Sequence, residues 1–218
     1  MLDRKKLLTM KKVKKSYKGN VILNCIDLEV GQGEVVCITG ANGSGKTTLL
    51  RIVLGFIYPD EGQVMVNGEK VAPGLLGNLA TKVDALIENP TFMGQFTGLQ
   101  NLSMLASIRG AISADEIREA IKKVGLDPYS KKLVGKYSLG MKQRLGIAQA
   151  IMEKPSLVLL DEPTNALDLE GRKIFSDIVE DMSSRGTSFI IVSHRTEEMD
   201  SLSTSIYNIE KGQLNKQK

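Results

Sequence analysis

The sequence has few cysteines and no long apolar run, and each shortage excludes a class of protein. Cys25 and Cys37 are the only cysteines in 218 residues, and neither belongs to a CxxC pair or stands beside further metal ligands. Both lie in apolar runs, where we expect a small buried hydrophobe. The cysteines therefore suggest neither a metal centre nor redox chemistry.

The apolar runs are also too short to cross a membrane. Those at 157–160 and 189–192 fall far below the ~20 residues of a transmembrane helix. Residues 1–10 lack the apolar centre of a secretory signal. We therefore expect the chain in the cytoplasm, or at the cytoplasmic face of the cell membrane as a peripheral protein.

An excess of charge of one sign is absent as well, because the formal net charge is only +4. No nucleic-acid partner is expected from so mild a balance. The lysine-rich stretch 4–18 is the exception, and we favour a solvated edge strand guarded by lysines. Contact with anionic lipid headgroups is the alternative.

A glycine-rich loop stands between an apolar run and a helix-forming stretch. Residues 34–50 read EVVCITGANGSGKTTLL, and the GxxxxGKT spacing within them is that of a P-loop. Backbone N–H groups, a helix N-terminus and the Lys46 ammonium favour a bound phosphate there, and the Thr47 hydroxyl suits Mg²⁺. A glycine-rich surface turn is the alternative, but it explains neither the preceding strand nor Lys-Thr at the helix start. The predicted nucleotide-contacting residues are Gly40, Ala41, Asn42, Gly43, Ser44, Gly45, Lys46, Thr47 and Thr48.

Several short apolar runs end in polar residues, which is typical of parallel strands buried on both faces. Such runs lie at 35–39, 82–87, 157–160, 189–192 and 205–209, and helical patterns cover 141–152 and 169–182. Runs at 8–13, 21–30 and 63–66 predict a small antiparallel sheet beside this core. We expect an α/β fold in one domain, 1–218. A P-loop core with a mostly parallel sheet and an antiparallel β subdomain would occupy 1–90 and 141–218, with a helical subdomain inserted at 91–140.

Asp161 and Glu162 directly follow one of the buried strands. Ligands are expected at the carboxyl ends of parallel strands. Hydrolysis of a nucleoside triphosphate needs Mg²⁺ at the β/γ-phosphates and a carboxylate that deprotonates the attacking water. We predict that Asp161 acts on the metal and that Glu162 is the base. A helix cap is the alternative for an acidic pair considered alone.

The motifs, taken in order, resemble those of ABC-transporter ATPases over nearly the whole chain. The matching segments are GANGSGKT in the P-loop, YSLGMKQR at 137–144, LVLLDEP at 157–163, NALD at 165–168, and His194. The resemblance implies an ATPase that uses ATP and Mg²⁺. It also identifies the segment around Ser138 and Gly140 as the family's signature motif, at a helix N-terminus suited to a γ-phosphate.

A P-loop holds ATP from one side only, so a second anion-binding helix implies a second subunit. The resemblance implies a head-to-tail dimer, either a homodimer or a heterodimer with a second ABC ATPase subunit. Each ATP would lie between the P-loop of one chain and residues 138–140 of the other. Asp168 would lie at the dimer seam and couple the two sites. A plain N-cap role for Ser138 is compatible with this arrangement.

The resemblance assigns two further residues. Tyr17, just before a turn, corresponds to the aromatic residue that stacks on adenine, whereas a lone tyrosine is more often a packing residue. His194, the single histidine, corresponds to the switch histidine that contacts the γ-phosphate and the catalytic water. A capping or packed histidine is the alternative.

The sequence departs from the family pattern at Glu88, where the family usually has glutamine. A carboxylate ligates Mg²⁺ at least as well as an amide, so we predict Glu88 as a metal ligand with Thr47 and Asp161. It also adds negative charge beside the acidic pair. Leu139 and Met141 replace the usual Gly and Gln of the signature LSGGQ. With IENP around Glu88, YSLGMKQR resembles the branch that includes bacitracin-resistance exporters and the immunity transporters of lantibiotic producers.

The resemblance favours the ATP-binding subunit of an ABC exporter that energises a separate transmembrane permease, with antimicrobial peptides or antibiotics as cargo. The permease contact would lie at 89–109, on whichever apolar side chains are exposed there. A soluble ABC ATPase that acts as an assembly or regulatory factor is the alternative. A P-loop kinase or GTPase of another family is a third, but it explains neither 138–144 nor His194.

Overall fold

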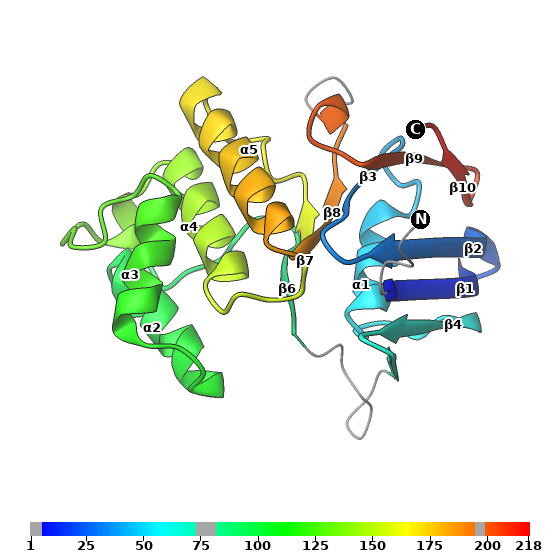
Figure 1. Cartoon of the computed structure of the whole chain (residues 1–218), viewed down its shortest axis with the longest axis horizontal. Helices are drawn as coiled ribbons and strands as arrows, with labels where there is room; N and C mark the ends of the chain where they lie inside the picture. Colours follow the sequence, from blue (N-terminus) through cyan, green and yellow to red (C-terminus); the bar gives the residue numbers. More distant parts are fainter. Residues whose placement is uncertain (1–5, 73–81, 195–198) are drawn as a thin grey trace.

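The computed structural model describes residues 6–72, 82–194 and 199–218, which form two sheets with helices between and beside them (Figure 1). In the described chain, one sheet has the strand order β10-β9-β3-β8-β7-β6, and an antiparallel sheet has the order β2-β1-β4-β5. The strands are β1 Lys6–Tyr17, β2 Asn20–Gly31, β3 Val35–Thr39, β4 Glu61–Val66, β5 Glu69–Lys70, β6 Val83–Leu86, β7 Leu157–Asp161, β8 Ser188–Val192, β9 Ser205–Glu210 and β10 Gln213–Lys216. The helices are α1 Lys46–Val53, α2 Gly98–Arg109, α3 Ala114–Lys123, α4 Leu139–Ile151 and α5 Leu169–Ser184, with a 3₁₀ turn at Val134–Lys136.

The larger sheet is parallel apart from β10. β3 pairs with β8 and β9, and β7 pairs with β6 and β8, each in parallel. Every residue of β7 and of β8 is buried, because both strands are apolar on both faces. Together with the antiparallel sheet, this arrangement confirms the predicted α/β fold.

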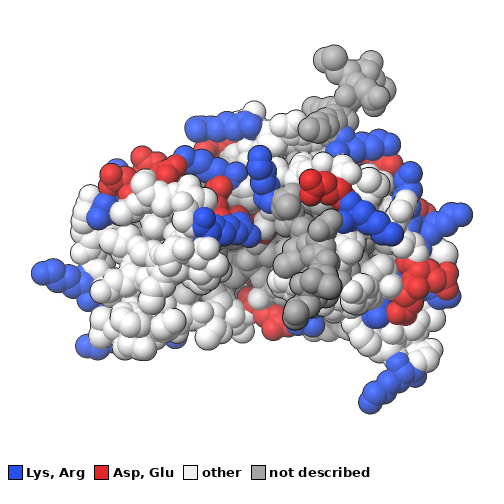
Figure 2. Space-filling view, turned by 90° about the horizontal axis from the view of Figure 1, so that it is seen from below, with Lys and Arg blue, Asp and Glu red and all other residues white. Residues whose placement is uncertain are grey.

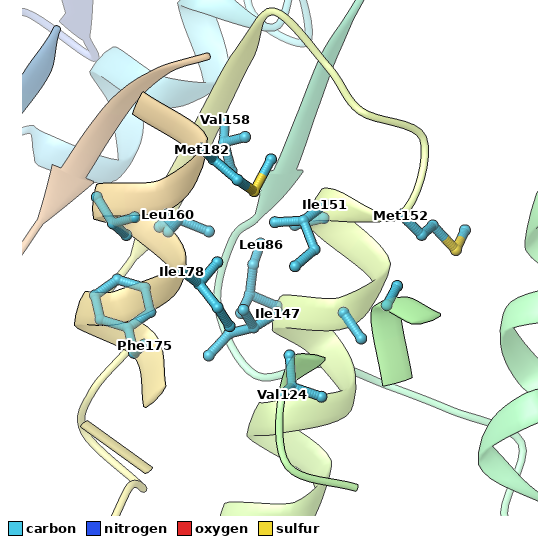
Figure 3. Close-up of a cluster of buried hydrophobic side chains, with 14 of the residues drawn as sticks. Leu86, Val124, Ile147, Ile151, Met152, Val158, Leu160, Phe175, Ile178 and Met182 are labelled. Atoms are coloured by element: carbon cyan, nitrogen blue, oxygen red, sulfur yellow. The ribbon is translucent and has the colours of Figure 1, made fainter. Parts of the chain in front are cut away.

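Two apolar clusters cover the two faces of the parallel sheet. Val158 and Leu160 point to one face, where α4 and α5 pack on them, with Phe175 of α5 fully buried (Figure 3). Leu157 and Leu159 point to the other face, into a cluster that includes α1 and the inner side of the antiparallel sheet. The sheet is therefore fixed from both sides. Its carboxyl edge, where β3, β6, β7 and β8 end together, is the edge at which ligands are expected.

One expectation about the lysine-rich N-terminal strand is wrong. β1 is not an edge strand, because it pairs with β2 on one side and with β4 on the other. Its lysines instead contact acids of these neighbours, Lys6 with Glu29 at 2.9 Å and Lys14 with Glu61 at 3.1 Å. Exposed ion pairs of this kind contribute at most about 1 kcal/mol each. The lysines thus keep one face of the sheet solvated.

The expectation for the first cysteine is also wrong, since Cys25 is exposed while Cys37 is buried. The register of β1 with β2 shifts beside Cys25, whose φ is 53°. This bulge places Asn24 and Cys25 on the solvent side between the buried Leu23 and Ile26. One extra residue therefore removes the cysteine from the core.

Helix α4 begins two residues earlier than the predicted 141–152. Ser138 Oγ accepts the backbone N–H of Met141 at 3.2 Å and so caps the helix before Leu139. The predicted border between 140 and 141 consequently falls within the first turn of α4. The division into core and helical subdomain itself remains a prediction.

The molecular surface carries charges of both signs. On the face shown in Figure 2, Lys and Arg side chains are interspersed with Asp and Glu rather than gathered in one field. Across the described ranges, we find no helix long and apolar enough to span a bilayer.

Gly62 of β4 is expected to be essential for the antiparallel sheet. Its φ is +86°, and a Cβ there would lie 2.5 Å from the carbonyl oxygen of Lys11 in the adjacent strand. Gly62→Ala should therefore lower the free energy of unfolding by about 3 kcal/mol, from backbone strain plus overpacking. Gly68→Ala is the matched control, because its φ of +83° is similar and no atom lies within 4 Å of the added Cβ. It should cost only about 1 kcal/mol. Urea unfolding measures both, and equal losses would contradict the steric argument.

Candidate nucleotide-binding site

A hollow of about 560 Å³ lies at the carboxyl edge of the parallel sheet. It is bordered by the P-loop, the start of α1, and the residues that follow β6, β7 and β8. The predicted site residues that line it are Tyr17, Asn42, Gly43, Gly45, Lys46, Thr47, Thr48, Glu88, Asp161, Glu162 and His194. Gly40, Ala41 and Ser44 belong to the same loop but are not among the lining residues.

The P-loop is held by its own lysine. Lys46 is only 7% exposed, and its Nζ donates hydrogen bonds to the carbonyl oxygens of Gly40 at 2.8 Å and Ala41 at 2.9 Å. Gly40 has a φ of +146°, and a Cβ there would lie 2.6 Å from the carbonyl oxygen of Ile209, so only glycine fits. Burial lowers the pKa of the Lys46 ammonium, and two nearby carboxylates oppose that shift. The cation is thus desolvated and aimed into the loop.

The loop also offers an unused donor. Within the described chain, the hydroxyl of Ser44 is shielded from solvent and has no hydrogen-bond partner. Buried polar atoms are normally hydrogen-bonded, so an orphaned hydroxyl in a loop of this shape suits a phosphate oxygen.

Thr47 and Asp161 belong to different elements and are hydrogen-bonded to each other at the border of the hollow. Thr47 is the second residue of α1, and its Oγ1 donates to Oδ2 of Asp161, the last residue of β7, at 2.7 Å. A hydroxyl and a carboxylate are hard oxygen ligands, which Mg²⁺ prefers together with phosphate oxygens and waters. These two residues fit a magnesium ion bound with a nucleotide.

Glu162 and His194 form the second pair at this edge. The backbone N–H of Glu162 donates to Val192 of the neighbouring strand at 2.9 Å, which fixes the start of the loop after β7. His194 Nε2 lies 2.9 Å from Oε1 of Glu162, whose side chain is only 19% exposed. Burial raises the pKa of Glu162, while the nearby histidine lowers it. A carboxylate with a raised pKa facing a phosphate site has the properties of a general base.

Tyr17 and Glu88 also border the hollow. Tyr17 ends β1 and is 44% exposed, with Lys15 Nζ 5.3 Å from the ring centroid. This exposed ring is suited to stacking on a base. Glu88 follows β6, and its carboxylate contacts the guanidinium of Arg51 on α1.

The remaining predicted residues lie elsewhere. Ser138, Gly140 and Asp168 line a second hollow of about 480 Å³, and none of the three lines the first. Asp168 caps α5 by accepting the Gly171 N–H at 2.8 Å and pairs with Arg144 at 2.7 Å. Those two contacts lower the pKa of Asp168. Leu139, between Ser138 and Gly140, lines the first hollow instead, and Ala166 lines both, so the two hollows adjoin.

Some lining residues were missed by sequence reasoning. Gln143 is 4% exposed and donates to the carbonyl of Pro163 at 3.0 Å, which ties α4 to the loop after Glu162. Asn165 also lines the first hollow. Both residues lie within the motifs YSLGMKQR and NALD, so membership of these motifs could have predicted that they lie at the site.

The fold and the first hollow define a P-loop protein that binds and hydrolyses nucleoside triphosphates. Comparison with known proteins narrows the class, since residues 23–165 match the family model described as ABC transporter. The chain belongs to this family and is an ATPase of the ATP-binding cassette type. The resemblance drawn from the sequence motifs is thus confirmed.

Individual relatives agree with this assignment. The chain is 39% identical over 200 residues to the ABC transporter ATP-binding protein YybJ of Bacillus subtilis, covering 92% of this chain and 91% of the relative. It is 37% identical over 201 residues to the bacitracin transport ATP-binding protein BcrA of Enterococcus faecalis, covering 92% and 65%. It is 33% identical over 208 residues to the lantibiotic transport ATP-binding protein SrtF of Streptococcus pyogenes, covering 95% and 89%.

A solved structure resembles the whole chain. It is a dimeric post-hydrolysis state of an ATP-binding cassette bound to ADP and Pi, with a TM-score of 0.82 and 25% identity, covering 97% of this chain and 98% of that one.

Proposed function

We propose that this chain is the ATP-hydrolysing subunit of an exporter and drives a separate transmembrane permease. The observation that carries the proposal is its similarity, along 92% and 95% of its length, to proteins named for bacitracin and lantibiotic transport. That similarity supports peptide antibiotics as the cargo. A subunit that drives a permease in this way would lie at the cytoplasmic face of the cell membrane.

The arrangement of the first hollow supports a mechanism for hydrolysis. Lys46 and the P-loop N–H groups would bind the β/γ-phosphates, and Thr47 and Asp161 would hold Mg²⁺. When bound, Mg²⁺ neutralises charge that develops on the phosphates. Glu162 would accept the proton of the attacking water, and His194 would hold that carboxylate toward the γ-phosphate. Tyr17 would stack on the adenine.

The position of Ser138 and Gly140 outside the P-loop hollow supports a dimer. Ser138 and Gly140 stand at the N-terminus of α4, where free N–H groups favour an anion. Since they do not line the P-loop hollow of their own chain, a second chain arranged head to tail is needed to bring them to the γ-phosphate. Asp168, beside them in the second hollow, would then lie at the seam.

The permease contact is proposed on the segment that follows β6. Among the apolar residues of 89–109, Met93 is 51% exposed, Leu105 37% and Ile108 79%. Leu102 is fully buried, so it belongs to the core.

The test is purification of the tagged chain from its own membranes in a mild detergent, followed by mass spectrometry. We expect a polytopic membrane protein in near-equal amount, and ATPase activity of the complex that rises when bacitracin or a lantibiotic is added. Met93→Glu should reduce recovery of that protein, whereas Tyr129→Glu, an exposed aromatic outside the segment, should not. Recovery of soluble partners alone would instead assign the chain to assembly or regulation.

A further inference from the structure

Glu88 follows strand β6 at the carboxyl edge of the parallel sheet, where Asp161 and Glu162 also lie. β6 and β7 are parallel, and Leu86 pairs with Leu160, so Glu88 follows its strand as Glu162 follows the neighbouring one. Glu88 also lines the nucleotide hollow, with Asp161 and Glu162. Three carboxylates therefore line the hollow in which a metal–nucleotide complex would bind.

Arg51 contacts the first of these carboxylates. It lies four residues after Thr47, about one turn further along α1, and its guanidinium pairs with Oε1 of Glu88. Both side chains retain water contact, with exposures of 40% for Arg51 and 64% for Glu88. The pair is thus accessible and exchangeable, unlike a buried ion pair.

Glu88 is paired with Arg51 and is not grouped with the other acids of the hollow. Among residues 6–72, 82–194 and 199–218, no three His, Cys, Asp or Glu side chains are grouped so that they could hold a metal ion. Asp161 is engaged by Thr47 instead. Glu88 therefore lines the same hollow as Thr47 and Asp161, the residues that would hold Mg²⁺, but its carboxylate does not join them in one ligand group.

We infer that Arg51 is a positioning residue that withdraws Glu88 from the magnesium site. Arg51 and the metal–nucleotide complex compete for one carboxylate, so the ion pair sets the Mg²⁺ concentration at which nucleotide is bound. A carboxylate at this position, unlike a glutamine, needs such a partner, because it would otherwise add a third negative charge to the site. The inference rests on the proposed binding of Mg²⁺·ATP at Thr47 and Asp161.

The competition is tested by measuring Mg²⁺-dependent binding of a fluorescent, non-hydrolysable ATP analogue. Arg51→Gln frees Glu88 and should lower the Mg²⁺ concentration for half-maximal binding about two- to five-fold, the range expected for losing an exposed ion pair. Arg51→Lys keeps the charge and should restore most of the original midpoint. Arg118→Gln is the matched control, since it removes the same charge from an ion pair with Asp115 on α3. It should leave the midpoint unchanged.

The same Arg51 substitution in a Glu88→Gln chain distinguishes competition for the Glu88 carboxylate from a general effect of removing the Arg51 charge. In a Glu88→Gln chain, Arg51 has no carboxylate to withdraw, so Arg51→Gln should no longer shift the midpoint. An equal shift in both backgrounds, or none in the original chain, would overturn the inference while leaving nucleotide binding intact. Failure of the unaltered chain to bind the analogue at any Mg²⁺ concentration would instead reject the proposed function.

Discussion

Glu162→Gln is expected to slow ATP hydrolysis by about 10²- to 10⁴-fold while leaving ATP binding intact. The glutamine keeps the size of the side chain but cannot take a proton from water. Lys46, Thr47 and Asp161, which would bind the phosphates and the metal, are unchanged. Phosphate release and fluorescent-nucleotide binding, measured on the same preparation, separate the two effects.

A control variant and a pH profile distinguish loss of the base from a general effect of removing a charge. Glu119→Gln removes the same charge from an exposed position on α3 and should leave turnover unchanged. Because burial raises the pKa of Glu162, the base becomes protonated at a higher pH than an ordinary carboxylate. Hydrolysis should accordingly fall on acidification before an exposed glutamate would titrate. Retention of more than a tenth of the turnover by Glu162→Gln would exclude it as the base.

Ser138→Asp is expected to abolish hydrolysis without weakening the fold or the binding of ATP to a single chain. Aspartate is as good an N-cap as serine, so α4 keeps its start. The added negative charge, however, lies where the γ-phosphate held by the partner would sit, and like charges repel there. We expect at least a 100-fold loss of turnover and loss of ATP-driven dimerisation, measured by light scattering.

Ser113→Asp provides the matched control, because Ser113 caps α3 in the same way outside both hollows. That variant should hydrolyse ATP normally. A stronger test mixes Ser138→Asp with Lys46→Ala chains, each inactive alone. In a head-to-tail pair one site then keeps an intact P-loop and an intact signature segment, so activity should return. No return would contradict the shared site.

The sequence predicted those parts of the fold that depend on patterns of neighbouring residues. Strands β7 and β8 are short apolar runs ended by polar residues, and the P-loop is a glycine spacing followed by Lys-Thr. Each of these signals lies within a few neighbouring positions. The sequence alone was therefore enough to predict a parallel sheet with acidic residues at its carboxyl edge.

Features that depend on distant pairing were not predictable in this way. The interior position of β1 requires β4, which lies beyond the whole P-loop and α1, and the exposure of Cys25 depends on a bulge set by the register of two strands. The contact between Arg51 and Glu88 joins residues 37 positions apart, with no periodic signal to indicate it. The sequence predicted that Glu88 is unusual; only the fold identified the residue that neutralises it.

The position of Ser138 outside the P-loop hollow of its own chain has a genetic consequence. In the proposed dimer, an altered signature segment damages the site whose P-loop belongs to the other copy. A cell that makes equal amounts of Ser138→Asp and unaltered chains would, by random pairing, hold about a quarter of its dimers with two intact sites. About half of the dimers would keep one intact site, as in the mixing experiment, and about a quarter would keep none. Such an allele would therefore lower the cell's ATP hydrolysis without abolishing it, and part of the loss would fall on P-loops that are themselves unaltered.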